Sequence, residues 1–255
     1  MLPDGPVVEK VYLDSSTGIL AGVTAAAKDS RVSKLIVECG TIQNATILEV
    51  AKATKETAQA LPQGSSLDFA DAPVSGGPMG AQAGTLAFMV GSDEPDTVFP
   101  AVKDVLNHMG NADSVFLCGP VGAGTAFKVI NNYLSAITSL AASEALNIGV
   151  KLGLDPTTLT NVINASGGQC WITSKSNPVP GVQANVPSSR NDEGGFRIEL
   201  CKKVLGMGTE LAQQAGARTV LDGPTMAAFE EAAADDRYKG KDARVVYKWL
   251  SESSR

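Results

Sequence analysis

Residues 119–140 read GPVGAGTAFKVINNYLSAITSL, a glycine-rich turn followed by a long apolar run. From Phe127 onward nearly every position that is not small is apolar, so we expect a helix that is buried around most of its circumference. One polar stripe interrupts it. At 3.6 residues per turn, spacings of four, three and four keep the four side chains of this stripe on one helix face: Lys128, Asn132, Ser135 and Ser139.

Lys128 is the residue of this stripe with the most chemical potential. An ammonium group is costly to bury, and burial lowers its pKa, which makes such a lysine a usable acid or base near neutral pH. The alternative is a lysine near the start of the helix whose long side chain reaches back to water. The helix sequence alone leaves both interpretations open.

The turn before the helix contains half of a dinucleotide-binding fingerprint. Residues 114–118 read as a strand that leads into Gly122-Ala123-Gly124, the beginning of a G-x-G-x-x-G pattern. The third glycine is replaced by Phe127, and the chain continues as helix instead of returning to a second parallel strand. We therefore interpret these glycines as a close-packed entry into the helix and not as a phosphate site.

Composition and charge narrow the class of protein. With 255 residues, 44% hydrophobic and 19% charged, the chain is long enough for two domains and for a packed core. A net charge of −6 without any cluster of Lys or Arg argues against nucleic acid or an anionic membrane surface as a partner. The longest uncharged run through the helix, residues 129–143, is shorter than the roughly 20 apolar residues of a membrane span.

Cysteine and histidine are few and scattered. The cysteines form no C-x-x-C pair and the one histidine is His108, so the sequence predicts neither a zinc site nor a disulfide framework. His108 cannot anchor a Ser-His-Asp triad alone, and we expect it at the surface near a helix end. We expect each cysteine to be a small buried hydrophobe in a reducing compartment: Cys39, Cys118, Cys170 and Cys201.

The pattern of secondary structure changes near residue 119. Before it, helices near 6–12, 44–60 and 94–108 alternate with strands at 35–39, 68–72, 86–90 and 114–118. After it only helices are expected, at about 121–150, 156–165, 196–214, 223–235 and 242–250, with an ordered loop or lid at 176–195. The fold class is α/β: a partial Rossmann-type doubly wound sheet in residues 1–118, then an all-α domain in residues 119–255.

A second stretch with chemical potential, residues 71–80, follows a predicted strand end, where ligands bind in open α/β sheets. Its Ser75-Gly76-Gly77 segment offers a hydroxyl and backbone N–H groups to a small anion. Because no Lys or Arg is near, a carboxylate suits this loop better than a polyphosphate. The alternative is a glycine-rich turn that only reverses the chain, and the loop by itself favours that alternative.

Several motifs in one order give the chain a family resemblance that covers essentially all of it. Residues 71–77 (DAPVSGG), residues 84–86 (GTL) and the pattern G-x-x-G-x-G-x-x-x-K-x-x-N-N of residues 119–132 resemble the β-hydroxyacid dehydrogenase family. Within that family, the 3-hydroxyisobutyrate dehydrogenases are similar also in Cys170-Trp171, in NPVPGV at 177–182, in LGLDP at 152–156 and in GGF at 194–196.

The resemblance implies a role for individual residues. Lys128 falls on the family's catalytic lysine, which exchanges a proton with the substrate hydroxyl while hydride moves to nicotinamide, and Asn132 falls on the asparagine that orients the substrate. The loop Ser75, Gly76 and Gly77 falls on the segment that binds the substrate carboxylate. The residues implied to contact the cofactor are Leu2, Pro3, Thr41 and Lys203.

The function implied by this resemblance is NAD-dependent oxidation of 3-hydroxyisobutyrate to methylmalonate semialdehyde, a step of valine catabolism in the mitochondrial matrix or otherwise in the cytoplasm. The C-terminal domain would bind substrate and form dimers, as part of a homo-oligomer, a dimer or tetramer, and would begin with a long interdomain helix. The choice between NAD and NADP stays open. So does the choice of β-hydroxyacid, because one methyl group in an apolar pocket changes binding by only about 1–3 kcal/mol.

The departures from the family lie mainly at the N-terminus. Family members begin with a strand, a G-x-G-x-x-G turn and a helix that hold the cofactor pyrophosphate, and we expect that Met1 is an internal methionine of a longer chain. Glu38-Cys39-Gly40-Thr41 replaces Asp-Ser-Ser-Thr, and Val204 replaces the aspartate after the cofactor lysine. Two alternatives follow: a catalytically inactive fragment that acts only as an association module, or an enzyme for another small β-hydroxyacid or semialdehyde.

Overall fold

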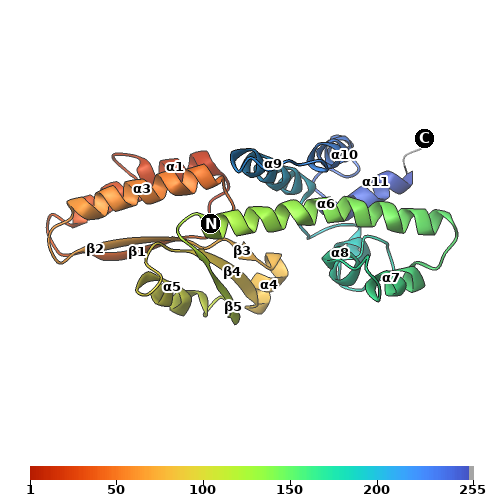
Figure 1. The fold of residues 1–255 in the computed structure, drawn as a ribbon, viewed down its shortest axis with the longest axis horizontal. Helices are drawn as coiled ribbons and strands as arrows, with labels where there is room; N and C mark the ends of the chain where they lie inside the picture. The colour runs from red at the N-terminus through yellow and green to blue at the C-terminus, as the bar shows by residue number, and fades with distance from the viewer. Residues whose placement is uncertain (253–255) are drawn as a thin grey trace. The chain divides into compact units, whose positions relative to one another are not determined.

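The computed structural model describes residues 1–252. It separates into two compact units, Met1–Val129 and Ile130–Arg255, each of which is described by itself. The separation falls within the long helix α6 (Ala123–Lys151), whereas the sequence places the domain boundary before this helix (Figure 1).

The first unit contains every helix and strand expected before residue 119, with ends shifted by a few residues. The expected helices are α1 (Gly5–Leu13), α3 (Asn44–Ala60) and α5 (Val98–Leu106). The expected strands are β1 (Ser33–Glu38), β2 (Ser66–Asp71), β4 (Leu86–Gly91) and β5 (Gly110–Gly119). The structure also contains three short elements that the sequence pattern does not predict, α2 (Ile19–Ala26), β3 (Val74–Ser75) and α4 (Gly77–Ala83).

The pairing of strands in the sheet of this unit places the carboxyl ends of three strands next to one another. β1 and β2 are parallel and pair along their whole length, from Ser33↔Ser66 to Glu38↔Asp71. β2 then meets β4 in antiparallel orientation at the single pair Asp71↔Gly91. β4 also pairs with β3 antiparallel and with β5 parallel. The carboxyl ends of β1 and β2 therefore adjoin, and the end of β4 meets them at Asp71.

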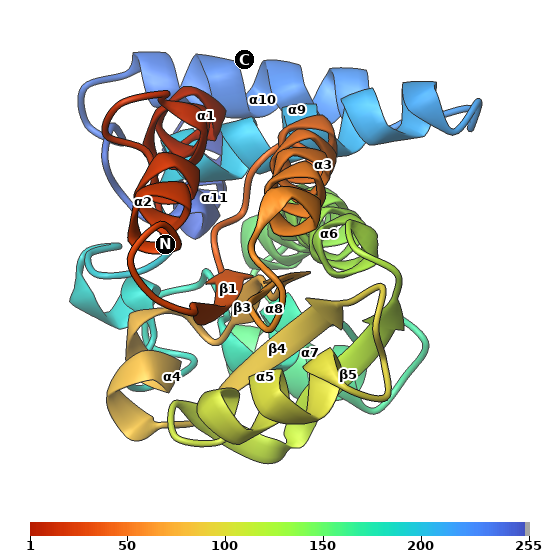
Figure 2. The ribbon, with the colours of Figure 1, turned by 90° about the vertical axis from the view of Figure 1, so that its left-hand side faces the viewer.

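Helices cover both faces of this sheet, as a doubly wound fold requires. Strand β1 shows the alternation, since Ile36 packs with α1, α2 and α3 while Leu35 and Val37 pack with the cluster that contains α5. Figure 2 shows α1, α2 and α3 on one side of the strands and α5 on the other. The predicted partial Rossmann-type α/β fold is confirmed.

The second unit is helical. Beyond α6 it contains α7 (Pro156–Asn164), α8 (Trp171–Lys175), α9 (Ile198–Gln214), α10 (Asp222–Ala234) and α11 (Val246–Glu252), with 3-10 turns η1 (Pro187–Arg190) and η2 (Ala243–Val245). Within the described part of this unit, which ends at residue 252, the only β-type pairing is an isolated antiparallel bridge between Arg197 and Asp242. The main core of this unit comes from α6, α9, α10 and the η2–α11 segment, including Ala136, Leu205, Phe229 and Val246.

The segment 176–195 is an ordered loop, as expected, and Asn177 holds it. The Asn177 amide Nδ2 donates to Thr160 Oγ1 at 3.0 Å, and its Oδ1 accepts from the Val179 N–H at 2.9 Å. Its backbone carbonyl accepts from Ser188 Oγ at 2.6 Å. Because Asn177 is 1% exposed, these bonds satisfy polar groups that water does not reach.

The expectation that α6 is buried around most of its circumference is wrong. Phe127, Ile130 and Leu134 are 56%, 59% and 60% exposed. The buried face combines apolar residues such as Leu146 with small and polar ones, and there Ser139 Oγ donates to the Ser135 carbonyl at 2.7 Å. A serine that bonds to its own helix can be buried without another partner, so polarity did not mark the exposed face of this helix. Within residues 1–252, no helix is long and apolar enough to cross a membrane.

Candidate active site

Lys128 lies in the second turn of α6 and is only 8% exposed. Burial lowers its pKa from 10.5 to about 8. A lysine that reaches water by extending along the surface would keep an ordinary pKa, so the burial favours the acid–base interpretation over that alternative. Asn132 follows one turn later on the same helix, half-buried, and its Oδ1 accepts a long 3.4 Å bond from Asn131.

The start of α6 is bound to the sheet by a buried carboxylate. Asp71, at the end of β2, accepts from the Gly122 N–H at 2.7 Å, from the Thr125 N–H at 2.6 Å and from Thr125 Oγ1 at 2.9 Å. A Cβ on Gly124 would come within 2.1 Å of the Met89 carbonyl oxygen. The glycines are thus a close-packed entry, as predicted, and the anion at this helix N-terminus is the protein's own carboxylate.

The Ser75-Gly76-Gly77 loop follows β2 by a few residues. Ser75 belongs to β3, opposite Ala87 of β4, and is half-buried, whereas both glycines are exposed. Gly76 has φ +135° and Gly77 has φ +60°, backbone angles that residues other than glycine rarely adopt. A Cβ on Gly76 would also lie 2.9 Å from Leu86 Cδ2. Glycine is therefore required here by geometry, and the exposed backbone remains accessible to a ligand.

A second group of predicted residues meets at the end of β1. The Gly40 N–H donates to Glu38 Oε1 at 2.6 Å, and a Cβ on Gly40 would be 3.3 Å from the Leu2 carbonyl oxygen. The structure therefore brings Leu2 and Pro3 beside the Gly40-Thr41 turn, although they are distant in sequence. Burial, with the nearby Glu38, raises the pKa of the Cys39 thiol to about 11, so this cysteine is no nucleophile at neutral pH.

The two loops leave the same edge of the sheet. Glu38 and Asp71 are paired at the ends of β1 and β2, and the Ala72 N–H donates to the Glu38 carbonyl at 2.8 Å. The turn with Thr41 and the loop with Ser75 are thus consecutive at the carboxyl ends of parallel strands, the place where open α/β sheets bind ligands.

The remaining predicted cofactor residue, Lys203, lies half-buried on α9 in the second unit. That unit also contains the GGF motif, and its geometry explains the middle glycine. Asp242 Oδ2 accepts from the Phe196 N–H at 2.7 Å, and a Cβ on Gly195 would collide with that carboxylate. The motif is therefore a turn folded tightly around a buried aspartate.

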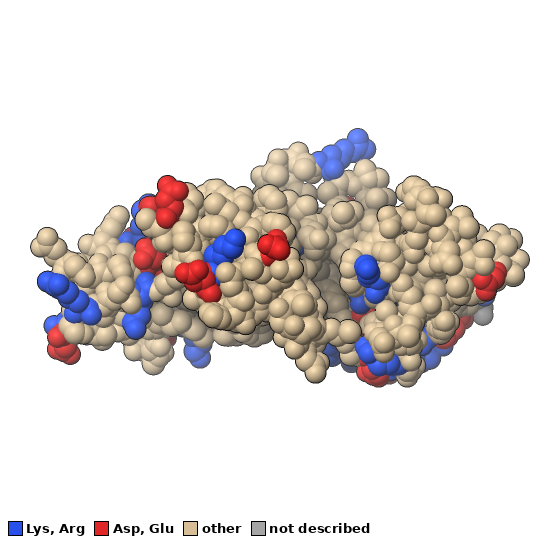
Figure 3. Space-filling view, turned by 90° about the horizontal axis from the view of Figure 1, so that it is seen from below, with Lys and Arg blue, Asp and Glu red and all other residues tan. Residues whose placement is uncertain are grey.

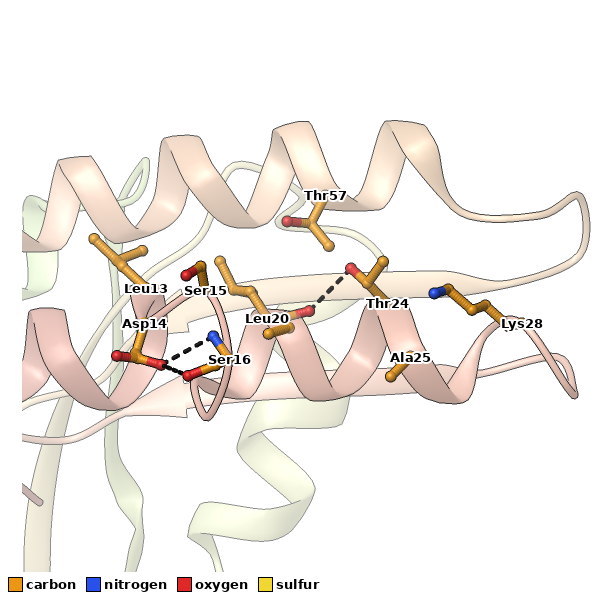
Figure 4. A pocket seen from close by; sticks show the side chains of 10 residues that line it. Leu13, Asp14, Ser15, Ser16, Leu20, Thr24, Ala25, Lys28 and Thr57 are labelled. Carbon is orange, nitrogen blue, oxygen red and sulfur yellow. Dashed lines mark hydrogen bonds between the residues drawn. The ribbon is translucent and has the colours of Figure 1, made fainter.

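A hollow of the first unit lies elsewhere, between the end of α1, α2 and α3 (Figure 4). It has a volume of about 480 Å³, and several of its polar groups already have partners within the protein. Asp14 Oδ1 accepts from Ser16 and Thr17 at 2.7–2.9 Å, and Thr24 Oγ1 donates to the Leu20 carbonyl at 3.0 Å. These bonds hold the pKa of Asp14 well below its usual range. None of the predicted site residues lines this hollow.

Charge and metal chemistry give no competing site in the described part of the chain. Lys and Arg are interspersed with Asp and Glu on the face shown in Figure 3. Across residues 1–252, no group of three or more His, Cys, Asp or Glu is arranged to hold a metal ion. His108 is exposed after the end of α5, as expected, while only Cys201 among the cysteines is fully buried.

Comparison with known proteins places this geometry in a family. Residues 1–119 match the model described as the NAD binding domain of 6-phosphogluconate dehydrogenase. Residues 122–250 match the model described as NAD-binding of NADP-dependent 3-hydroxyisobutyrate dehydrogenase. The chain belongs to the 3-hydroxyisobutyrate dehydrogenase family. Both matching models describe NAD-binding domains, so the family's cofactor is a nicotinamide dinucleotide.

Individual relatives agree with this assignment. The mitochondrial 3-hydroxyisobutyrate dehydrogenase of Homo sapiens is 36% identical over 91% of this chain, and the Pseudomonas aeruginosa enzyme is 38% identical over 97% of it and 77% of the relative. A structure of the Mycobacterium tuberculosis enzyme with L-serine has 32% identity and a TM-score of 0.81, covering 98% of this chain and 77% of that one. The chain spans 65% of the length of the human relative.

The sequence indicates the loops and Lys128 but not the residues that hold them in place. Asp71 belongs to the DAPVSGG motif without a predicted role, and Glu38 is only a departure from the family pattern. A polar signal is present in both cases, because each is an acidic residue at the carboxyl end of a strand, directly after apolar residues. Both side chains are buried here, and a buried carboxylate needs hydrogen-bond donors nearby.

Proposed function

We propose that the protein catalyses NAD-dependent oxidation of a small β-hydroxyacid, 3-hydroxyisobutyrate, to its semialdehyde. The observation that carries this proposal is the burial of Lys128 on α6, with a pKa of about 8. A group of this pKa exchanges protons readily near neutral pH. In oxidation the neutral Lys128 amine accepts the hydroxyl proton, and in the reverse direction the ammonium returns it.

The substrate carboxylate is bound by the Ser75-Gly76-Gly77 loop in this proposal. The exposed glycine backbone and the Ser75 hydroxyl can donate hydrogen bonds to an anion, and Asn132 orients the substrate from the helix turn after Lys128. The L-serine in the M. tuberculosis structure supports this class of substrate, since L-serine is itself a small β-hydroxy carboxylate.

The residues at the end of β1 fit a nicotinamide dinucleotide. Two buried oxygens there, Gln43 Oε1 and Asn44 Oδ1, accept no hydrogen bond from the described residues, which leaves acceptors for a group such as a carboxamide. Leu2, Pro3 and Thr41 would hold the nicotinamide end, and Lys203 would contact the cofactor from α9. When bound, the dinucleotide supplies the hydride acceptor.

The compartment is part of this proposal. The human relative is named mitochondrial and the P. aeruginosa relative is bacterial, and the proposed compartment is the mitochondrial matrix or otherwise the cytoplasm. We also propose that the protein acts in valine catabolism and that it forms a homo-oligomer.

The test is a spectrophotometric assay of NAD or NADP reduction, with the dinucleotide taken to saturation. We expect turnover with 3-hydroxyisobutyrate and little with 2-methyl-1-propanol, which has the same branched hydroxymethyl group but no carboxylate. Ser75→Ala should raise KM for the acid, whereas Ser15→Ala, an exposed serine of the unrelated hollow, should not. Equal turnover of acid and alcohol would contradict the carboxylate loop, and no turnover of either would contradict the proposed reaction.

A further inference from the structure

We propose that Asp71 is the positioning residue that fixes Lys128 relative to the substrate-binding loop, an inference that rests on the proposed function. Asp71 ends β2, and the chain runs from it directly into Ser75-Gly76-Gly77. Its carboxylate meanwhile binds the first turn of α6. One side chain thus joins the two segments that the reaction needs in register.

The bond to α6 is made close to the catalytic position. Thr125 gives both its N–H and its hydroxyl to Asp71 Oδ2, at 2.6 and 2.9 Å. Lys128 follows Thr125 by three residues, slightly less than one helical turn, so both lie on the same side of the helix. Any displacement of the first turn is passed to Lys128 by the rigid helix backbone.

The environment of Asp71 selects a carboxylate. Asp71 accepts three hydrogen bonds, from the Gly122 N–H, the Thr125 N–H and the Thr125 hydroxyl. An ionised carboxylate, whose two oxygens are both acceptors, can accept all three. The side chain is 0% exposed. Burial raises the pKa of Asp71, while the bonds from Gly122 and Thr125 and the N-terminal end of the α6 dipole oppose that rise.

The backbone of the neighbouring strand and helix packs closely around this carboxylate. A Cβ on Gly91, the strand partner of Asp71, would lie 2.2 Å from Asp71 Oδ1, and one on Gly124 would lie 3.0 Å from Oδ2. Glycines on both sides let β4 and α6 close on the aspartate. An altered side chain at this position therefore has to move α6 rather than shift by itself.

The expected consequence is kinetic. In Asp71→Asn one acceptor oxygen becomes a donor that faces other donors, so the first turn of α6 loosens. Because about 1 Å of misplacement can cost on the order of 100-fold in rate, we expect kcat to fall at least tenfold with KM for 3-hydroxyisobutyrate changed less than threefold. A purely structural defect would lower the concentration of active enzyme. It would not lower kcat once the rate is divided by the active-site concentration that titration gives.

Three further variants keep the test decisive. Thr125→Val removes only the hydroxyl bond, so it should fold even if Asp71→Asn does not and should show the same kcat loss to a smaller degree. Thr125→Ser restores the hydroxyl and should recover the parent kcat. Asp68→Asn removes a carboxylate from the same strand, where Asp68 is only half-buried, and should leave kcat unchanged.

Two readouts separate this inference from the proposed reaction. Amide hydrogen exchange at Gly122 and Thr125 should accelerate in Asp71→Asn and Thr125→Val but not in Asp68→Asn. If the parent shows no turnover, the proposed reaction fails, and the pKa of Lys128 Nζ measured by NMR decides instead: a rise toward 10.5 in Asp71→Asn supports the positioning role. The inference is overturned by an unchanged Lys128 pKa in that case, or by kcat within threefold of the parent in both Asp71→Asn and Thr125→Val.

Discussion

The Tyr12 hydroxyl donates a 2.9 Å hydrogen bond to Glu38 Oε2, and this bond ties helix α1 to the end of β1. Both residues are buried, and the second oxygen of Glu38 accepts from the Gly40 N–H. Burial and the neighbouring carboxylate raise the pKa of Tyr12 well above its usual value, so the phenol keeps its proton. The Leu2-Pro3 segment before α1 is thereby held beside the turn that contains Thr41.

Removal of this hydroxyl should cost stability. In Tyr12→Phe a buried carboxylate oxygen loses its donor, so we expect the free energy of unfolding to fall by about 1–3 kcal/mol, measured by chemical denaturation. Tyr133→Phe is the control, because Tyr133 is half-buried and its hydroxyl has no hydrogen-bond partner among the described residues. Equal stability of Tyr12→Phe and the parent would show that the bond to Glu38 does not hold α1.

The close entry of α6 into the sheet makes a second prediction. Gly124→Ala places a methyl group 2.1 Å from the Met89 carbonyl oxygen, and backbone has to move to relieve it. We expect a loss of about 1–3 kcal/mol or more in stability, seen as a lower melting temperature. Gly22→Ala on α2, where nothing lies within 4 Å, should be neutral or slightly stabilising. A Gly124→Ala protein as stable as Gly22→Ala would mean that the helix does not pack as described.

Hydrophobic period and turn chemistry predicted most of this fold, and particular residues show where they stopped. Asp155-Pro156 correctly predicted the start of α7, because the Asp155 carboxylate caps the helix through the Thr158 N–H. The apolar run after Phe127 correctly predicted α6 but not its exposed face. An apolar side chain does not indicate which other residues it packs against, so the sequence does not predict whether Ile130 and Leu134 are buried.

The candidate site was predictable for a different reason. Lys128 stands out because a charged residue in an apolar helix is unusual, and Ser75-Gly76-Gly77 stands out because paired glycines follow a strand. Asp71 and Glu38 were less visible, since their partners Thr125 and Tyr12 are distant in sequence and come close only when the sheet forms. Long-range hydrogen bonds of this kind leave no periodic signal.

The depressed pKa of Lys128 predicts how stability depends on pH. Below about pH 8 the lysine is charged in both states, and the folded state bears the full cost of the buried ammonium. Between about 8 and 10.5 the folded state has lost this proton while the unfolded state still binds it, so stability rises with pH. Lys128→Met lacks this rise. It should exceed the parent in unfolding free energy by on the order of 3 kcal/mol at pH 7, and the difference should vanish near pH 10.5.

That comparison requires denaturation curves of both proteins at pH 7, 9 and 10.5. Lys34→Met, an exposed lysine on β1, is the control and should show no such convergence. If Lys128→Met and the parent differ by the same amount at all three values, Lys128 titrates normally and is not buried as a charge.

The most direct test of the catalytic assignment is kcat for 3-hydroxyisobutyrate oxidation by Lys128→Met at saturating dinucleotide, measured beside its circular dichroism spectrum. Methionine keeps an unbranched apolar side chain of nearly the same length as the lysine but cannot exchange a proton. The assignment predicts a native-like spectrum with kcat lower by on the order of 10²–10⁴-fold. A native-like spectrum with kcat within about threefold of the parent, far less than acid–base catalysis contributes, would contradict the role of Lys128 as the proton-transfer residue.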